Sequence, residues 1–267
     1  MPKTWKVFLA ILILSGYNKV PHRRLYWSEL PDTQNKFVMN AMRRDAFDQI
    51  MRCLHFSDNT KMNDDRFYKV RPLFEHLNNA IKDEKCCECY SVDEIMVPYY
   101  GRHGDKQYIR GKPVRFGFKL WAISTSDGIL RHVEPYCGSH SRISDRGFGL
   151  GGNVVLGMIE KVNMKATQHV VFDNFFGSVS LLEELAQRKI PATCTLREDR
   201  LSGAPLKKRT ILEKEERGTS DEAFTGCISV VKWKDNKVVS IASNKLCTDP
   251  VKKSRKVESS GQETYLC

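Results

Sequence analysis

The sequence has no apolar run of the roughly 18 residues that a membrane-spanning helix needs. The apolar stretch at residues 8–14 is much shorter. Lys3 and Lys6 precede it and Ser15 and Gly16 follow it, an arrangement similar to a signal peptide. Because no disulfide pattern downstream supports secretion, we interpret the stretch as a buried helix that begins a domain, and we expect no membrane partner.

The sequence also lacks a disulfide framework and an excess of acidic residues. Its nine cysteines are odd in number and spread over 267 residues, which indicates a reducing compartment, the cytosol or the nucleus. Lys plus Arg number 43 against 32 Asp plus Glu, so the net charge is +11. That excess favours a polyanionic partner, with nucleic acid ahead of an anionic membrane surface. The hydrophobic fraction of 41% is typical of a globular chain.

The first third of the chain has a helical pattern. Over residues 5–85 apolar residues recur at helical spacing, and Pro21 and Pro31 separate short helices. A helix is predicted over residues 71–82, with Leu73 and Leu77 facing inward. We predict a helical domain of the dimerisation or DNA-binding type at residues 1–88.

From residue 90 the apolar residues no longer recur at helical spacing and follow the pattern of β-strands. A β-branched series begins at residue 92, and two further runs, 117–125 and 129–136, flank an Asp-Gly turn that predicts a hairpin. A helix over 154–162, a strand at 169–172, a helix over 177–189 and a strand at 192–196 follow. The predicted order β-β-β-α-β-α-β makes the fold class α+β. It also makes the first and fourth strands neighbours, as in an RNase H-like sheet.

Beyond residue 197 the sequence no longer alternates between predicted helices and strands. Residues 197–222 are mostly charged or small and predict a mobile loop, whereas residues 228–233 and 238–243 predict one more hairpin. We therefore divide the remainder into a core at 89–197, a β-rich region with a mobile loop at 198–247 and a disordered basic and polar tail at 248–267.

Two carboxylates carry the chemistry that the sequence suggests. Asp93 and Asp173 each stand at one end of an apolar strand, where a charge requires compensation. A divalent metal is such compensation, since Mg²⁺ prefers a few carboxylate oxygens together with waters and phosphates. Aspartate at strand ends is also common in turns and helix caps, an alternative that is stronger for Asp173, which precedes a helix. The neighbouring Glu94 is expected on the opposite face of its strand and is not counted as a ligand.

Several segments together resemble the piggyBac family of transposases. The core resemblance lies in residues 91–102 (SVDEIMVPYYGR), 108–113 (YIRGKP), 117–121 (GFKLW) and 172–176 (FDNFF). Residues 14–17 (LSGY) and 52–56 (RCLHF) are similar to the family's helical amino-terminal part, and residues 231–235 (VKWKD) to its insertion region. The resemblance runs from about residue 5 to 250.

This resemblance implies an RNase H-like DDE/D fold that uses three aspartates and two divalent ions. Asp93 and Asp173 match the first and second catalytic, metal-binding positions. The third aspartate of the family lies in a Gly-Gly-Val-Asp motif, which the 267 residues do not contain. We therefore expect an incomplete core, truncated before the third acidic motif, that binds Mg²⁺ or Mn²⁺ weakly.

The function expected on this basis is that of a domesticated, transposase-derived DNA-binding protein of the nucleus that is catalytically inactive. One alternative is an active DDE/D strand transferase or nuclease, if the native chain is longer. Another is a protein-interaction module without DNA activity. A homodimer formed through the helical domain is also expected.

Basic residues support DNA contact independently of the resemblance, and the alternative for the same cluster is a solvated face of the hairpin. Candidate phosphate contacts cluster between residues 102 and 119, interleaved with aromatic residues, and recur in a short run after residue 206: Arg102, Lys106, Arg110, Lys112, Arg115, Lys119, Lys207, Lys208 and Arg209. The short run could also act as a nuclear import signal. No zinc is predicted, because the cluster Cys86, Cys87 and Cys89 has no second Cys/His pair at finger spacing.

Overall fold

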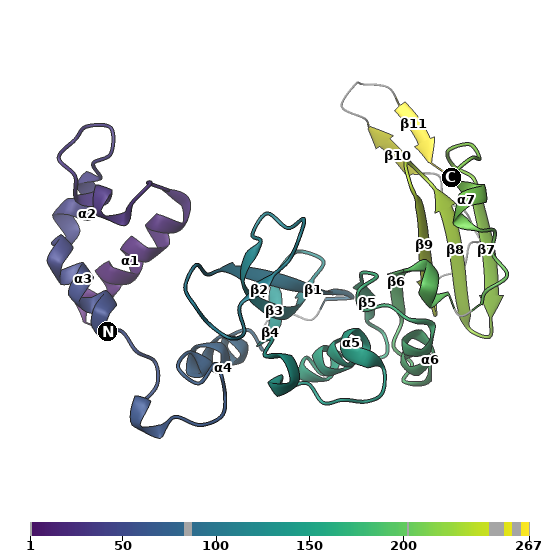
Figure 1. The fold of residues 1–267 in the computed structure, drawn as a ribbon, viewed down its shortest axis with the longest axis horizontal. Coiled ribbons are helices and arrows are strands. Elements are labelled where there is room, and N and C mark those ends of the chain that lie inside the picture. The colour runs from purple at the N-terminus through teal and green to yellow at the C-terminus, as the bar shows by residue number, and fades with distance from the viewer. Residues whose placement is uncertain (1, 83–86, 202, 246–253, 258–262, 267) are drawn as a thin grey trace. The chain divides into compact units, whose positions relative to one another are not determined.

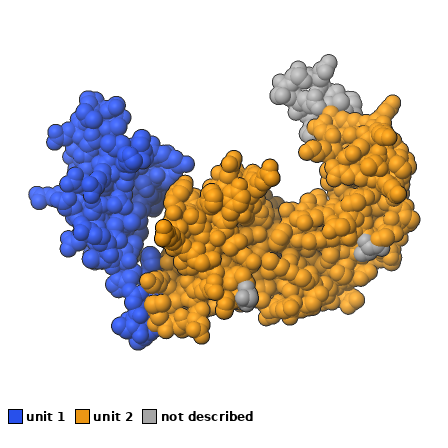
Figure 2. Space-filling view, in the orientation of Figure 1, with its two compact units in different colours: residues 1–61 blue, residues 62–267 orange. Residues whose placement is uncertain are grey.

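The computed structural model describes residues 2–82, 87–201, 203–245, 254–257 and 263–266 (Figure 1). They divide into two compact units, residues 1–61 and 62–267 (Figure 2). No helix in the described part of the chain is long and apolar enough to cross a membrane.

The first unit is a small helical cluster. Its elements are α1 (Lys3–Tyr17), the 3₁₀ turn η1 (Arg23–Trp27), α2 (Lys36–Ala41), α3 (Arg44–Cys53) and the 3₁₀ turn η2 (Asn59–Lys61). The apolar stretch at residues 8–14 lies within α1, where Phe8 and Ile11 are buried while Ile13 faces solvent. Phe8 packs on Phe47 of α3 with 5.0 Å between ring centroids. The prediction that this stretch is part of a buried helix is therefore confirmed for one face of α1.

The second unit is built on a nine-stranded mixed sheet. The order of its strands is β2-β3-β1-β5-β6-β9-β8-β7, with β4 paired to β3. The strands are β1 (Cys89–Pro98), β2 (Gln107–Tyr108), β3 (Phe116–Thr125), β4 (Leu130–Pro135), β5 (His169–Phe172), β6 (Ala192–Leu196), β7 (Ser220–Thr225), β8 (Ile228–Lys234) and β9 (Val238–Ser243). β1 lies beside β5, as expected. The two strands run parallel, and so do β5 and β6.

Two helices cover one face of this sheet, α5 (Gly149–Lys161) and α6 (Val179–Gln187) (Figure 1). Alternate strand residues point to the same face, and those on the helical side form one buried cluster with the helices. Its strand members include Val92, Val170 and Phe172, all at most 3% exposed. Ser178 caps α6 by accepting a hydrogen bond from the Leu181 amide at 3.2 Å.

The opposite face of the sheet is partly open. Ile95 and Val97 of β1 are each 42% exposed, and Val171 and Ile241 are nearly as exposed. The helix α4 (Arg71–Ala80) packs at β4, where Asn78 hydrogen-bonds the backbone of Val133. The central strands therefore carry apolar side chains that solvent reaches.

The helix α4 is held by buried ion pairs and by the contact of its Phe74 with the buried Phe67. Leu73 and Leu77 are 46% and 39% exposed, so the prediction that they face inward is wrong. Arg71 is buried instead, and its guanidinium pairs with Asp65 at 2.6 Å and with Glu134 of β4 at 2.8 Å. Because these bonds join α4 to the sheet, the helix belongs to the second unit although it precedes residue 88.

The region after β6 extends the sheet. β9 pairs antiparallel with β6, and the predicted hairpin is β8 with β9. The segment predicted to be a mobile loop contains the short helix α7 (Arg209–Leu212), and β7 begins at its end. Lys232 of β8 is 1% exposed, and its amine donates to Glu198 at 2.5 Å and to the Lys207 carbonyl at 2.9 Å. These bonds fasten the loop to the sheet.

The tail that was expected to be disordered contains two strands. β10 (Ser254–Val257) and β11 (Glu263–Leu266) pair antiparallel in a separate two-stranded sheet. The other residues of this tail lie outside the described part of the chain.

Replacing Arg71 with methionine tests whether its ion pairs hold the second unit together. We expect the free energy of unfolding of this unit to fall by about 3–5 kcal/mol, because the carboxylate of Glu134 would stay buried without its counter-charge. Urea unfolding of the variant measures the change. The matched control Arg115→Met removes an exposed arginine and should cost no more than about 0.5 kcal/mol. Equal losses in the two variants would contradict the structural role of Arg71.

The half-buried imidazole of His132 predicts a pH dependence. Burial lowers its pKa to about 4, and within the described residues its Nε2 has no hydrogen-bond partner. The unfolded chain, with a histidine pKa of about 6.5, therefore binds more protons than the folded chain between these values, and stability falls as the pH falls from about 6.5 to 4. Melting temperatures measured across this range should drop less steeply in His132→Gln. Identical slopes in the two proteins would rule this out.

Candidate functional site

The pairing of β1 with β5 brings the two candidate aspartates together. Val92 pairs with Phe172 at the end of the parallel ladder, and Asp93 and Asp173 are the next residues on the two strands. Asp93 lies within β1, which continues to Pro98 beside β3, whereas Asp173 follows the last residue of β5. The sequence-based expectation that these strands are adjacent is confirmed, and the two carboxylates stand side by side at the end of the ladder.

Backbone amides hold both carboxylates from one side. Oδ1 of Asp93 accepts a hydrogen bond from the Glu94 amide at 2.7 Å, and Oδ1 of Asp173 accepts one from the Phe175 amide at 2.9 Å. Both aspartates line an open cavity of about 390 Å³ on the uncovered face of the sheet, together with Thr193 and Thr195 of β6. The carboxylates are thus ordered and accessible.

Glu94 lies on the other face of β1 from Asp93, as expected. It pairs with Trp121 of β3, whose ring is buried on the helical side, whereas Asp93 lines the cavity on the uncovered side. Oε1 of Glu94 forms a 2.9 Å ion pair with Lys112. Burial opposes ionisation of Glu94, but the Lys112 hydrogen bond and the charges of Lys119 and Lys112 together outweigh it and lower the pKa of Glu94. Partial burial raises the pKa of Asp93, and the charges of Glu94 and Asp173 add to that rise.

Lys119 lies beside the same group of acids in an aromatic setting. Its amine is 4.0 Å from the ring centroid of Trp121 and 4.4 Å from that of Phe175. Burial lowers the pKa of Lys119, although the charges of Glu94 and Asp173 act against that effect. The sequence carries no signal for this environment, because Trp121 and Phe175 come from segments more than 50 residues apart that only the folded sheet brings together.

This arrangement could hold one hard divalent cation. Mg²⁺ is commonly bound by one or two carboxylates together with waters and phosphates, and Asp93 and Asp173 supply that set. Among the described residues no group of three or more His, Cys, Asp or Glu side chains has metal-binding geometry. Glu94 does not complete such a group, since Lys112 already engages its Oε1. The residues present therefore fit one ion better than two.

The predicted phosphate-binding residues fall into two groups. Arg102, Arg110 and Arg115 are exposed and form no ion pair within the described part of the chain. Lys106 donates to the Gly101 carbonyl at 3.2 Å. Most residues of the second group already contact acidic side chains or aromatic rings. Lys112 pairs with Glu94, and the amine of Lys119 lies over aromatic rings. Lys207 pairs with Glu215 and Arg209 pairs with Glu213, and Lys208 lies between Lys207 and Arg209 just before α7.

The cysteine cluster is described only in part, because Cys86 lies outside the described residues. Sγ of Cys87 is 3.3 Å from Oγ of Ser126, and that hydrogen bond lowers the pKa of the Cys87 thiol. Cys87 and Cys89 are both free thiols.

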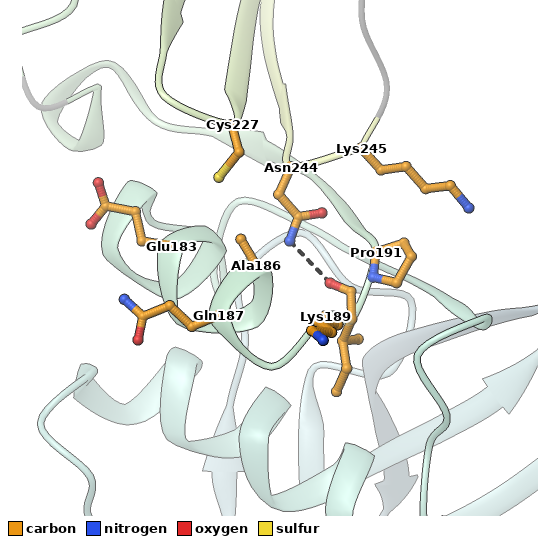
Figure 3. A pocket seen from close by; sticks show the side chains of 9 residues that line it. Glu183, Ala186, Gln187, Lys189, Pro191, Cys227, Asn244 and Lys245 are labelled. Atoms are coloured by element: carbon orange, nitrogen blue, oxygen red, sulfur yellow. Dashed lines mark hydrogen bonds between the residues drawn. The ribbon is translucent and has the colours of Figure 1, made fainter.

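A larger cavity, of about 660 Å³, lies elsewhere in the second unit (Figure 3). It shares no lining residue with the cavity at the aspartates. Side chains of α6, including Glu183 and Gln187, border it, and Asn244 crosses it to donate to the Ile190 carbonyl at 3.0 Å (Figure 3). Its polar groups serve to join β9 to the α6–β6 connection.

Comparison with known proteins agrees with this architecture. A family model described as Transposase IS4 matches residues 3–265. The chain is 42% identical over 245 residues to human PiggyBac transposable element-derived protein 3, and 41% identical over 253 residues to human PiggyBac transposable element-derived protein 2. These matches cover 90% and 92% of this chain but 41% and 43% of the relatives, so the chain spans about two-fifths of their length.

A solved structure has the same fold. The cryo-EM structure of a piggyBac transposase synaptic complex with hairpin DNA superposes with a TM-score of 0.78 at 22% identity, covering 98% of this chain and 54% of that one. The fold is therefore α+β with an RNase H-like core. The family match and the fold together define a protein of the transposase class. Its relatives make the assignment more specific: the chain belongs to the piggyBac transposase family.

Proposed function

We propose that this chain is a domesticated, transposase-derived protein that binds DNA through the β2–β3 hairpin beside its two aspartates. The observation that carries the proposal is the set of exposed arginines at 102, 110 and 115, which no acidic side chain neutralises within the described residues. The related piggyBac structure, described as a complex with DNA, adds support.

The local charge balance favours a phosphate backbone. Between residues 101 and 119 the one acidic residue is Asp105, which is 4% exposed and paired with Arg66 at 2.8 Å. Its charge is therefore already compensated. The exposed arginines therefore carry positive charge that no acidic side chain of the described residues neutralises. DNA phosphates are the most general partners for such charge.

Replacing Arg110 with glutamine tests this proposal. We expect weaker binding to duplex DNA and a slope of log K against log salt that is shallower by about 0.9, the value for one lost phosphate contact. Fluorescence anisotropy at several salt concentrations measures both. Lys165→Gln, at an exposed position after α5, is the control and should leave the slope unchanged. A wild-type chain that binds no DNA would sink the proposal and favour a protein-interaction role.

We also propose that Asp93 and Asp173 bind one Mg²⁺ or Mn²⁺ ion weakly and that residues 1–267 do not by themselves carry out strand transfer. Support comes from the side-by-side carboxylates and from the engagement of Glu94 by Lys112. When bound, the ion would polarise a phosphate oxygen or a water. Asp93 and Asp173 would hold it, and Lys112 keeps Glu94 from serving as a further ligand.

Calorimetric titration with Mn²⁺ tests the metal proposal. We expect one ion per chain, with affinity reduced by at least about tenfold in Asp93→Asn or Asp173→Asn, since even outer-shell changes cost about 10–100-fold. Asp127→Asn, in the exposed β3–β4 turn, should bind as the wild type does. Unchanged affinity in both site variants would contradict the site. Metal-dependent DNA nicking that is lost in Asp93→Ala would instead favour the second candidate function, an active strand transferase.

The proposal extends to a nuclear location, where a DNA-binding chain meets its ligand, and to a homodimer formed through residues 1–61. Support for the dimer comes from apolar side chains that this unit leaves exposed, among them Ile13, Tyr17 and Phe37 at 71%, 75% and 85%.

A further inference from the structure

We propose that Tyr108 and Phe116 form a platform on which the unpaired bases of single-stranded DNA stack. The inference rests on the proposed DNA binding and makes it more specific. The two residues face each other across the β2–β3 ladder, with ring centroids 4.8 Å apart and ring planes inclined by 42°. Their exposed fractions are 56% and 50%, so each ring keeps a large apolar area in contact with solvent.

Among the phenylalanines of β3, Phe116 at the start of the strand is the exposed one. Phe118, two residues further along the strand, packs against Phe67 and Tyr99 with centroid distances of 5.3 and 4.7 Å. Phe116 has Tyr108 as its aromatic neighbour, because β2 is a two-residue strand at the edge of the sheet. A cross-strand aromatic pair stabilises a hairpin by about 0.2–1 kcal/mol, and that role leaves the outer side of both rings unused.

Positive charge surrounds the pair. The amine of Lys106 is 5.3 Å from the ring centroid of Phe116. Arg110 and Arg115 lie between Tyr108 and Phe116 in the sequence, each within two residues of one of the rings, and both are exposed. Aromatic rings that accept stacked bases, combined with cations that follow a phosphate backbone, are the features that bind single strands. A duplex can use the cations, but its bases are already stacked on one another and do not reach the rings.

The hairpin is also tied to the aspartates. Lys112 lies in its turn and pairs with Glu94 at 2.9 Å, next to Asp93. Gly117 lets β3 approach β1 closely, because a Cβ at that position would lie 2.0 Å from the Val97 carbonyl oxygen. Phe116 stands six positions before Ala122, the partner of Asp93, which is about 20 Å along the strand. A strand held on the platform therefore lies on the element that borders the carboxylates.

The test uses the full chain and two labelled strands of equal length, oligothymidine and an abasic strand that keeps the phosphates but has no bases. Fluorescence anisotropy should show tighter binding of oligothymidine by the wild type. In Phe116→Leu this preference should fall by about tenfold, since stacking contributes roughly 1–3 kcal/mol per base. Tyr108→Phe keeps the ring and should keep the preference. Phe224→Leu, at a 58% exposed phenylalanine of β7, is the matched control.

Several outcomes would overturn the platform. One is equal affinity of the wild type for oligothymidine and the abasic strand. Another is equal weakening of both by Phe116→Leu while circular dichroism shows an intact fold. Tighter binding of oligouridine than of oligothymidine would overturn the assignment to DNA. A change in sedimentation without a change in base preference would show that the rings contact a second copy of the chain. Duplex binding that persists in these cases would leave the proposed function standing, whereas loss of all DNA binding by the wild type would remove both.

Discussion

The parallel pairing of β1 with β5 is the interaction on which the rest of the structure depends. Val92 and Phe172 are buried beneath α5 and α6, and the residues that follow them are the two aspartates. A slip of one residue in either strand would turn its aspartate toward the helices and its buried apolar residue toward solvent. Burying a carboxylate without compensation is costly. The register that satisfies the hydrophobic core is therefore the same register that sets the two acids side by side.

A helix or strand could be predicted from the sequence where its own residues have the pattern of apolar and capping residues typical of that element. β5 is a short apolar run with β-branched residues, and α6 has a cap and an amphipathic pattern, so both were predicted from sequence. β7 (SDEAFT) has no such pattern, because its order comes from pairing with β8. Leu73 is exposed because α4 contacts the rest of its unit through Arg71, Phe74 and Asn78, which lie on another face of the helix.

The candidate site divides in the same way. Asp93 and Asp173 could be found because each directly follows apolar strand residues, although Asp93 lies within β1 and not at its end. The engagement of Glu94 by Lys112 could not, because it depends on how the β2–β3 turn folds back over β1. The net charge of +11 likewise does not show which lysines and arginines are exposed and free to bind a ligand. Lys232 is buried and bonded within the protein, whereas Arg102 and Arg115 remain exposed. Only the second kind of residue can meet a ligand.

Asn244 has a consequence for the order in which the chain acquires its structure during synthesis. Its side chain accepts from the Ala192 amide and donates to the carbonyls of Ile190 and Leu182, residues 52 to 62 positions earlier. A ribosome releases those earlier residues long before Asn244 emerges. The α6–β6 connection therefore waits for these bonds, and β6 waits for its pairing with β9, until nearly the whole described sheet has been made. Contacts of such sequence separation form late and slowly. The nascent chain must keep the unpaired edge of β6 from joining other strands during that interval.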